Sequence, residues 1–383
     1  MTEDPHGDWD PRSPEVLADQ IGAYDALRAS ATMARSDYLG WSVLRHADVV
    51  AVLHDPGRFS SAVSTHLNVP NGMDPPEHTA CRHIIDGYFT PELVGAFEPT
   101  CRRIAAELVA ALPRGGQARM MSGFAELFAV RVQSAYLGWP EELTEPLLQW
   151  TARNREATLA RDREAMAAVA VEFDGYITQL LGVRRDTDPP PDDLTTRLLG
   201  ERIDGRPFTD PELVSILRNW TVGELGTISA SVGIVAHHLA AHPDVQDRVR
   251  TDAGLIGPAV DEILRIHPPL IANRRITTRP VDVGGQRLPA GERLTLLWAS
   301  ANRDERVFGD PDEFRLDRDP GLNLLYGAGI HVCPGAPLAR LELRVLIEEL
   351  LHGTSWLDLD PDEEAVRAIH PGSGFTRLPM RVR

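Results

Sequence analysis

The chain has 383 residues, 43% of them hydrophobic, which is enough for a sizeable buried core. Its 56 acidic and 39 basic residues give a formal charge of −17, and this argues against a general nucleic-acid binder, which would present a basic surface. Three cysteines are too few to suggest a secreted disulfide framework. The polar start has no signal-peptide pattern, and no apolar run reaches the ~18–20 residues of a membrane span. We therefore expect a cytoplasmic protein that does not enter a membrane.

The first half of the chain is predicted to be mostly helical. Residues 1–15 are expected to be a disordered lead, and residues 16–383 a single domain. YDALRAS and RHADVVAVLHDP predict short helices on either side of a strand in YLGWSVLR. From Pro91 to Gly200, apolar residues recur every three or four positions, as in amphipathic helices. The segment DTDPPPDD breaks this pattern and predicts a surface loop.

A long helix is predicted to follow Thr209. This residue is a candidate N-cap, and Glu212 three positions later completes a capping box. The helical pattern continues to His242, a length of about 50 Å at the helical rise per residue. The segment is apolar nearly all round, so the helix should be buried and central. Its interior glycines destabilise a helix and need a structural reason: Gly223, Gly226 and Gly233.

After Pro268 the pattern changes from helical to alternating. ITTRPVDVGGQRLPAGERLTLLWASANRD contains a Gly-Gly turn and predicts short β-structure. A coil, DERVFGDPDEFRLDRDPGLN, follows it. Because there is no internal repeat or long linker, we expect one mainly α domain with a small β part, an α+β fold.

One cysteine lies in an unusual setting, in the stretch YGAGIHVCPGAPLARLEL. Its glycines allow sharp turns, and the run after Pro334 predicts a helix. The sulfur of Cys333 should therefore lie near a helix N-terminus, where backbone N–H groups and the helix dipole favour a thiolate. A buried structural cysteine is the alternative. No catalytic triad is recognisable, and zinc would require more Cys and His nearby, whereas a single thiolate suits an axial ligand of haem iron.

YGAGIHVCPG resembles the cysteine-ligand loop of the cytochromes P450, the haem-thiolate monooxygenases, with Tyr326 where phenylalanine is usual. The resemblance covers nearly the whole chain and includes RHADVVAVLHDPGRFSS and ANRDERVFGDPDEF. It implies the cytochrome P450 fold, a large single domain with its long central helix above the haem. It also implies haem b as the cofactor and Cys333 as the ligand of its iron.

DEILRIHPP places Glu262 and Arg265 three positions apart on one helix face, a spacing that usually marks a surface ion pair. The resemblance implies instead that the pair is buried and bound to a later arginine. The matching residue is Arg318 in PDEFRLDR. We expect this group to hold the scaffold and to take no part in the chemistry.

Two further segments resemble those that bind the haem propionates. MDPPEHTACRHIIDGYFTP implies His78 and Arg82 as propionate ligands, with a solvated helix face as the alternative. NRRITTRPVDVGGQRLPAGE implies Arg275, its neighbour Arg274 being the less favoured choice. His331 in the cysteine loop matches another propionate contact. A buried anionic edge requires such donors.

In TVGELGTIS, Thr227 matches the family's threonine that orders protons near bound oxygen. The family usually has an acid directly before this threonine, whereas this chain has Gly226. Glu224, three positions before Thr227, is the candidate to serve the same proton path, or else it is a structural carboxylate.

The implied reaction inserts one atom of O2 into a mostly apolar small organic molecule, by hydroxylation, epoxidation or O- or N-dealkylation, and releases the other as water. The chain has no flavin or nicotinamide fingerprint and no Fe–S cysteine cluster, so electrons should come from a separate ferredoxin and ferredoxin reductase. Four arginines either dock this donor or are ordinary surface residues: Arg102, Arg103, Arg340 and Arg344.

The substrate pocket is predicted from positions along the chain: Trp220, Val222, Leu225, Ile271, Asn273 and Phe375. The segment AVSTHLNVPNGM is short for a substrate-covering loop, so the pocket is either more open or closed by other elements.

Three functions stay open: a ferredoxin-dependent monooxygenase, a peroxide-driven peroxygenase, to which the missing acid at Gly226 points, and a non-catalytic haem sensor or carrier.

Overall fold

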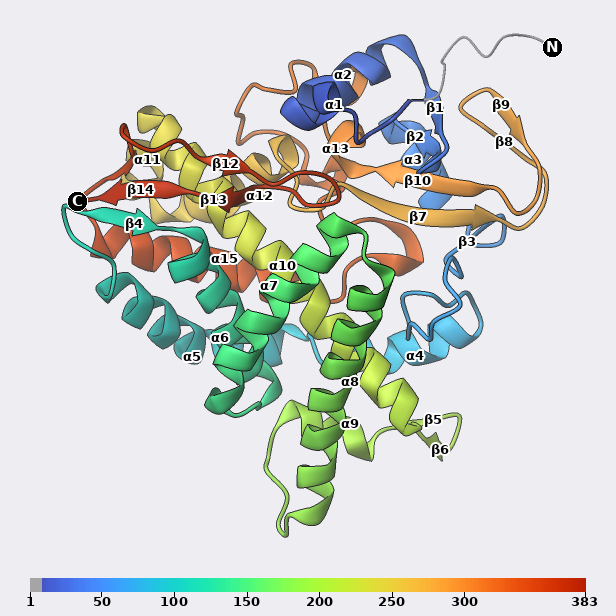
Figure 1. Ribbon diagram of the computed structural model, residues 1–383, viewed down its shortest axis with the longest axis horizontal. Coiled ribbons are helices and arrows are strands. Elements are labelled where there is room, and N and C mark those ends of the chain that lie inside the picture. The colour runs from blue at the N-terminus through green and yellow to red at the C-terminus, as the bar shows by residue number, and fades with distance from the viewer. Residues whose placement is uncertain (1–8) are drawn as a thin grey trace.

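The central helix α10 spans Asp210–Ala241, 32 residues, in the computed structural model, which describes residues 9–383 (Figure 1). The capping box at its start is present, with the Thr209 N–H donating to Glu212 Oε2 at 2.8 Å. Most side chains in its second half are buried, which confirms the predicted long, buried helix. Several other helices pack directly against α10, and the remaining helices lie outside this inner group.

The remaining α-helices are α1 (Pro14–Ala18), α2 (Gln20–Ser30), α3 (His46–Leu53), α4 (Glu77–Asp86), α5 (Pro91–Ala110), α6 (Glu126–Leu137), α7 (Thr144–Ala160), α8 (Arg163–Asp186), α9 (Leu194–Gly200), α11 (Pro243–Thr251), α12 (Ile256–Ile266), α13 (Trp298–Ala301), α14 (Glu305–Phe308) and α15 (Ala336–Gly353). A π-helix, η1 (Met121–Ala125), leads into α6. Short 3-10 turns are η2 (Glu141–Leu143), η3 (Ala253–Leu255), η4 (Pro320–Leu322) and η5 (Gly329–His331).

The glycines of α10 have different roles. A Cβ atom on Gly233 would lie 2.5 Å from the sulfur of Met121, so a larger residue there would require the flexible Met121 side chain of η1 to shift. A Cβ atom on Gly223 or Gly226 would meet no atom within 4 Å. These two glycines therefore face open space, on the stretch of α10 that also carries Thr227.

The main sheet has five strands in the order β1-β2-β10-β7-β3. It joins distant parts of the chain, because β10 pairs in parallel with β2 and antiparallel with β7 (Figure 1). The strands of this sheet are β1 (Met33–Ser36), β2 (Gly40–Val43), β3 (Phe59–Ser60), β7 (Ala272–Thr277) and β10 (Arg293–Leu297). The predicted Gly-Gly turn joins the hairpin of β8 (Val281–Val283) and β9 (Gln286–Leu288), where Gly284 and Gly285 both have positive φ.

Three smaller pairings complete the β part. A three-stranded sheet has the order β11-β14-β4, and two-stranded ribbons are formed by β12 with β13 and by β5 with β6. The strands are β4 (Gln117–Arg119), β5 (Arg202–Ile203), β6 (Arg206–Pro207), β11 (Leu357–Leu359), β12 (Val366–Arg367), β13 (Phe375–Arg377) and β14 (Pro379–Val382). These strands carry the last part of the chain back onto the helices.

Two expectations differ from the structure. WASA, predicted as β, forms helix α13. The expected disordered lead is ordered from Trp9 onward, since the Trp9 ring packs edge-to-face on Tyr24 and its N–H donates to the Arg35 carbonyl at 3.0 Å. Residues 1–8 of that lead lie outside the described residues.

The short segment AVSTHLNVPNGM is fastened to α10 by its backbone. The Val69 N–H donates to Ser215 Oγ at 2.9 Å, and the Ser215 hydroxyl donates to the Leu67 carbonyl at 3.1 Å. Arg218 donates to the Leu67 carbonyl, and Asn219 to the Val69 carbonyl, each at 2.8 Å. These bonds fix the position of the segment against α10.

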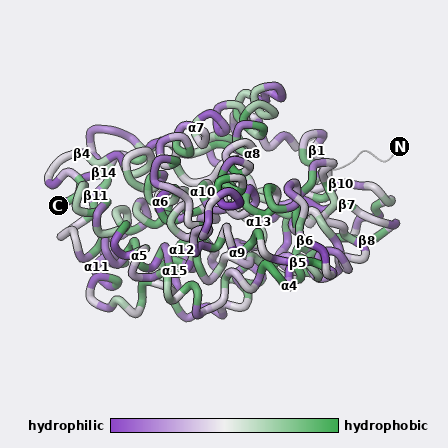
Figure 2. Tube along the Cα trace, turned by 90° about the horizontal axis from the view of Figure 1, so that it is seen from below, coloured by the Kyte–Doolittle hydropathy of each residue, from purple (hydrophilic) through white to green (hydrophobic). Residues whose placement is uncertain are grey.

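Hydrophobic and hydrophilic residues are interspersed along the described part of the trace (Figure 2). Among residues 9–383, no helix has both the length and the apolar character that a membrane crossing requires.

Candidate active site

The cysteine loop lies at the start of α15, as predicted. The Cys333 N–H donates to the Tyr326 carbonyl at 2.8 Å, and the backbone N–H groups of Gly335 and Ala336 are directed at the Cys333 sulfur. Gly329 has a φ of +68°, and a Cβ atom there would lie 2.2 Å from the Leu53 carbonyl oxygen of α3. Glycine is therefore required at this position for the loop to reach α3.

The thiol of Cys333 lies inside the protein and still has accessible surface. Burial raises its pKa, while the two backbone N–H groups oppose that shift. The two observations agree if the sulfur lines an internal space that solvent can reach. Neighbouring Val332 is also 41% exposed, although it belongs to the same interior loop. A bound metal cation would hold such a sulfur as the thiolate.

Basic and donor side chains from three elements converge beside the loop. His78 of α4 and His331 have ring centroids 4.2 Å apart, and burial lowers the pKa of both rings, that of His331 to about 4. Arg275 of β7 is buried, lies close enough to His331 to affect its pKa, and donates only to the Arg274 carbonyl among the bonds of the described residues. Arg82 of α4 donates to the Ile330 carbonyl and pairs with Asp86.

This donor set lacks acceptors. Both ring nitrogens of His78 are buried without a hydrogen-bond partner, which is rare in folded proteins. The nearby acid Asp74 accepts from the Ser60 hydroxyl and the Ser61 N–H. A ligand with two carboxylates would supply the missing acceptors, so the residues present fit a haem with its propionates here and its iron at Cys333. Arg274 is exposed, and its positive charge helps to lower the pKa of His370 instead.

Thr227 lies in the middle of α10, where its hydroxyl donates to the Gly223 carbonyl at 2.7 Å. Glu224 occupies the same stretch and is near enough to Cys333 to affect the pKa of that thiol. The structure therefore brings Thr227, Glu224 and Cys333 into one region. Gly226, the position of the missing acid, is exposed to the open space described above.

The carboxyl of Glu224 faces that of Glu342 on α15, and we call these residues the glutamate pair. Glu342 is fully buried, and burial raises the pKa of both carboxyls. No sequence motif pointed to Glu342. The pattern that could have revealed it is an acid on the apolar stripe of α15, between the buried Leu338 and Leu346 at helical spacing.

The buried ion pair predicted in DEILRIHPP is confirmed, and with Arg318 it forms what we call the Glu262 network. Arg265 donates to both oxygens of Glu262, at 2.8 and 3.0 Å, and Arg318 donates to Oε1 at 2.9 Å. Arg265 and Glu262 are 1% and 6% exposed. The remaining donors of Arg265 reach the carbonyls of Asn302 and Pro311.

The predicted pocket residues divide into two groups. Leu225, Ile271 and Phe375 are buried in hydrophobic clusters and present almost no accessible surface, so their assignment as pocket walls is not supported. Val222 and Asn273 are exposed. Trp220 is half-buried and its ring lies against Tyr88 and Phe89, with centroids 5.2 and 5.3 Å away.

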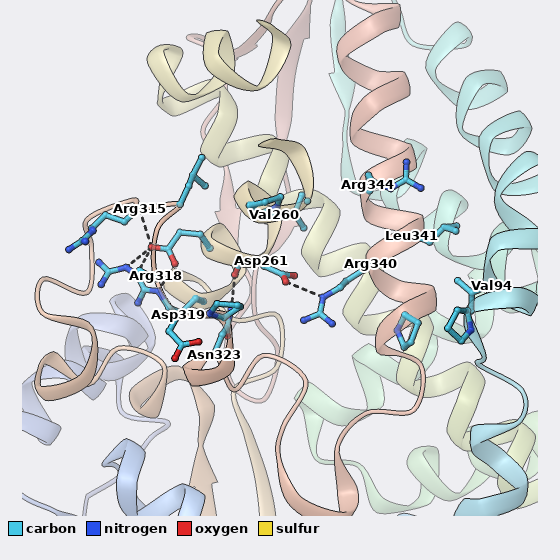
Figure 3. A pocket seen from close by; sticks show the side chains of 18 of the residues that line it. Val94, Val260, Asp261, Arg315, Arg318, Asp319, Asn323, Arg340, Leu341 and Arg344 are labelled. Atoms are coloured by element: carbon cyan, nitrogen blue, oxygen red, sulfur yellow. Dashed lines mark hydrogen bonds and ion pairs between the residues drawn. The ribbon is translucent and has the colours of Figure 1, made fainter. Parts of the chain in front are cut away.

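A surface cavity of about 640 Å³ lies on the side of α15 that carries Arg340 and Arg344 (Figure 3). Arg340 donates to Asp261 at 3.0 Å and covers the Tyr326 ring at 4.4 Å. Arg344 pairs with Glu98 and Glu348. The other two docking candidates are also ion-paired, Arg102 with three glutamates and Arg103 with Glu107. None of the four is therefore a free cation.

Comparison with known proteins identifies the family. The family model described as Cytochrome P450 matches residues 143–381. The chain is 33% identical over 335 residues to cyclomarin C epoxidase CymV of Salinispora arenicola, with 83% of this chain and 84% of that protein covered. It is 31% identical over 368 residues to erythromycin C-12 hydroxylase of Saccharopolyspora erythraea, with 92% of each covered. The solved structure of a mutant of P450 EryK in complex with erythromycin B superposes with a TM-score of 0.87 at 30% identity, covering 95% of this chain and 96% of that chain.

The chain belongs to the cytochrome P450 family and has its fold, so it is a cytochrome P450 monooxygenase. The family binds haem b through a cysteine thiolate, which confirms the predicted cofactor.

Proposed function

We propose that this cytochrome P450 takes electrons from a separate ferredoxin and ferredoxin reductase and hydroxylates or epoxidises a mostly apolar small organic molecule. The single observation that carries the proposal is the accessible Cys333 sulfur at a helix N-terminus, beside donors that lack acceptors. The named activities of the relatives, an epoxidase and a hydroxylase, support the choice of reaction. The free state of all three cysteines supports a cytoplasmic setting.

Each site residue has a proposed role. Cys333 binds the haem iron, and the propionates are held by His78, Arg82, Arg275 and His331. Haem with a thiolate ligand supplies the reductive activation of dioxygen. Thr227 positions protons with its hydroxyl, and Glu224 supplies the carboxyl that the chain lacks at Gly226.

Replacement of the thiolate tests the core of the proposal. Cys333→Ala should abolish the strongly red-shifted Soret band of the reduced CO complex. Cys81→Ala removes a buried thiol of α4 and should leave that band unchanged. A normal CO spectrum in Cys333→Ala would refute the ligand assignment.

The propionate assignment has a matched pair of adjacent arginines. Arg275→Gln should weaken haem retention several-fold, because it removes a buried cation from an anionic ligand. Arg274→Gln should retain haem normally, because that side chain is exposed. Equal haem loss in the two variants would contradict the assignment.

The electron donor is proposed to dock over the cavity beside Arg340 and Arg344. Charge reversal of either arginine should slow ferredoxin-driven turnover and flatten its salt dependence. Arg103→Glu, at an arginine that does not line the cavity, is the control. Unchanged turnover in the Arg340 and Arg344 variants would remove this docking site.

Gly226 favours a second candidate function, a peroxide-driven peroxygenase, because the usual acid is missing there. Turnover with peroxide alone, compared with turnover under ferredoxin and reductant, distinguishes the two. Faster product formation with peroxide alone would favour the peroxygenase. Coupled consumption of reductant, oxygen and substrate would exclude a non-catalytic haem sensor or carrier.

A further inference from the structure

Several segments that are distant in the sequence meet around the ring of Tyr38. Tyr38 lies in the turn between β1 and β2, Arg12 precedes α1, and Arg161 joins α7 to α8 (Figure 1). The guanidinium carbon of Arg12 lies 4.2 Å from the centroid of the Tyr38 ring, and that of Arg161 lies 6.0 Å from it. The ring of His370, in the turn between β12 and β13, meets the Tyr38 ring edge-on at 5.7 Å. Two cations are therefore gathered over one aromatic side chain.

The positive charge of these two arginines is only partly balanced. Arg12 donates to Asp10 Oδ1 through its side chain at 2.9 Å and through its backbone N–H at 3.0 Å. These bonds lower the pKa of the Asp10 carboxyl, and the charge of Arg161 adds to the shift. Arg161 itself makes no ion pair among residues 9–383. The neighbouring acid, Asp162, instead accepts from two backbone N–H groups in the first turn of α8.

A third cation, Arg274 of β7, lies near the same histidine. Arg274 is exposed and has no ion pair within the part of the chain that the structure describes. With Arg12 and Arg161 it forms what we call the arginine cluster. Burial and the charges of the arginine cluster lower the pKa of His370 to about 4, so this ring is neutral at pH 7. Its Nδ1 atom is buried and has no hydrogen-bond partner among the described residues. Such a concentration of positive charge favours a bound anion.

The backbone at Arg161 has a conformation that arginine rarely adopts. Its φ is +56°, in the left-handed region, where glycine and asparagine are favoured. Glycine would end α7 at this position with less strain. The chain nevertheless has an arginine here, and its guanidinium lies over Tyr38.

The arginine cluster lies at the edge of the candidate active site. On β7, Arg274 directly precedes one of the proposed propionate ligands. The turn that carries His370 continues to Gly374, where a Cβ atom would lie 3.3 Å from the Ala230 carbonyl oxygen of α10. Ala230 is about one helical turn beyond Thr227. This turn therefore connects the arginine cluster with the part of α10 that carries Thr227.

We propose that the arginine cluster binds an acidic group, a carboxylate or a phosphate, that the otherwise apolar substrate carries. Guanidinium groups suit this role because they donate two parallel N–H bonds to such groups. Arg161 and Arg274 supply the unpaired charges, and Asp10 orients Arg12. The inference deepens the proposed function and rests on it only for the statement that the ligand is the substrate.

The first test compares an acid with its neutral ester. The haem-loaded protein is titrated calorimetrically with phenylalkanoates of increasing chain length and with their methyl esters. At low ionic strength the best acid should bind about tenfold more tightly than its ester, and added salt should weaken the binding of the acid alone. Equal affinities, or no binding by any of the acids, would overturn the proposal.

Two arginines of one loop provide the matched variants. Arg161→Gln should weaken binding of the acid about fivefold and leave the ester unchanged. Arg163→Gln removes an equal charge two residues away, at an exposed side chain without a contact to Tyr38, and should change neither. Arg161→Gly should lose the same affinity without a fall in unfolding free energy, because glycine adopts the positive φ readily. Unchanged acid binding in both Arg161 variants would overturn the site.

Inorganic phosphate distinguishes a substrate group from a free anion. Phosphate should bind more weakly than the acids and should leave the Soret band unchanged. The acids should shift that band, because only they carry an apolar body that can reach the haem. Phosphate binding as tight as that of the best acid would overturn the assignment to a substrate.

Product analysis separates this inference from the proposed function. With ferredoxin and reductant, Arg161→Gln should raise the KM for the acid and leave the KM for its ester unchanged. A protein that binds the acids through the arginine cluster but oxygenates neither acids nor esters would refute the proposed function and leave the anion site intact. Equal oxygenation of acid and ester at low concentration would overturn the anion site and leave the proposed function intact.

Discussion

The Glu262 network and the glutamate pair are both buried, but their hydrogen bonding differs completely. In the Glu262 network, opposite charges meet, and each Glu262 oxygen accepts at least one N–H. In the glutamate pair, like groups meet, and three oxygens have no donor among the described residues. A satisfied buried charge holds a scaffold together, whereas an unsatisfied one is tolerated mainly where function requires it. The hydrogen bonding therefore assigns the Glu262 network to structural support and the glutamate pair to the chemistry of the site.

The largest effect should come from breaking the Glu262 network. Glu262→Ala leaves the guanidinium of Arg265 buried and unpaired, which costs about 3–5 kcal/mol of unfolding free energy. Denaturant unfolding of the haem-loaded protein measures this loss. The control is Glu313→Ala, at an exposed acid 3.9 Å from Arg315, where the change should stay within about 0.5 kcal/mol. Similar losses in the two variants would mean that the network is not a scaffold.

A smaller loss should follow removal of the outer member of the same network. Arg318→Ala should cost about 1.5–3 kcal/mol, because Glu262 keeps Arg265 but loses a charged hydrogen bond. Arg318 also donates to the carbonyls of Phe308, Asp310 and Glu313, so proteolysis should become faster in this segment. A loss equal to that of Glu262→Ala would show that Arg318 is as central as the buried pair.

The stability contributed by Glu342 should fall as the pH rises. Burial raises the native pKa of Glu342 above its ordinary 4.5, so the native state holds the proton more tightly than the unfolded chain. Its contribution to stability is complete below that ordinary value and is lost as the pH rises toward the native pKa. Glu342→Gln does not titrate, so from pH 5 to pH 8 its stability should improve relative to wild type by about 1 kcal/mol or more. Thermal or denaturant unfolding across this range gives the result, and parallel curves would contradict the raised pKa.

Of these variants, Thr227→Ala should have the smallest effect on stability. It should have a large effect on coupling, the fraction of electrons that is recovered in product. Thr227→Ala removes one hydroxyl bond to a helix carbonyl and should change the unfolding free energy by less than about 1 kcal/mol. It should nevertheless divert electrons from product to peroxide. Thr221→Ala, six residues earlier, removes the same kind of bond, to the Leu217 carbonyl, and should leave coupling intact. Equal coupling in the two variants would show that Thr227 contributes only to packing.

The sequence predicted those features that local patterns or fixed motif spacing determine. The capping box located the start of α10, and the cysteine loop located the start of α15. The spacing of Glu262 and Arg265, together with the later Arg318, located a buried network. In each case the residues lie on one element or in motifs of recognisable order.

Other features depended on contacts between distant segments. The glutamate pair forms only because α10 and α15 pack together, and periodicity within either helix does not show which acids meet. Leu225, Ile271 and Phe375 were assigned by position, but neighbouring elements bury them in hydrophobic clusters. Trp298–Ala301 continues an apolar run from β10, and such a short run does not distinguish strand from helix.

The attachment of the Leu67–Val69 segment to α10 has a consequence for how this protein can change. The segment is held by hydrogen bonds from its peptide carbonyls and one peptide N–H to Ser215, Arg218 and Asn219. Almost every amino acid possesses these peptide groups. Side chains of this segment can therefore be exchanged without loosening its hold on the helix. The exposed His66 and Leu67 form a ready set of positions for random mutagenesis, where new selectivity could be sought at little expense to folding.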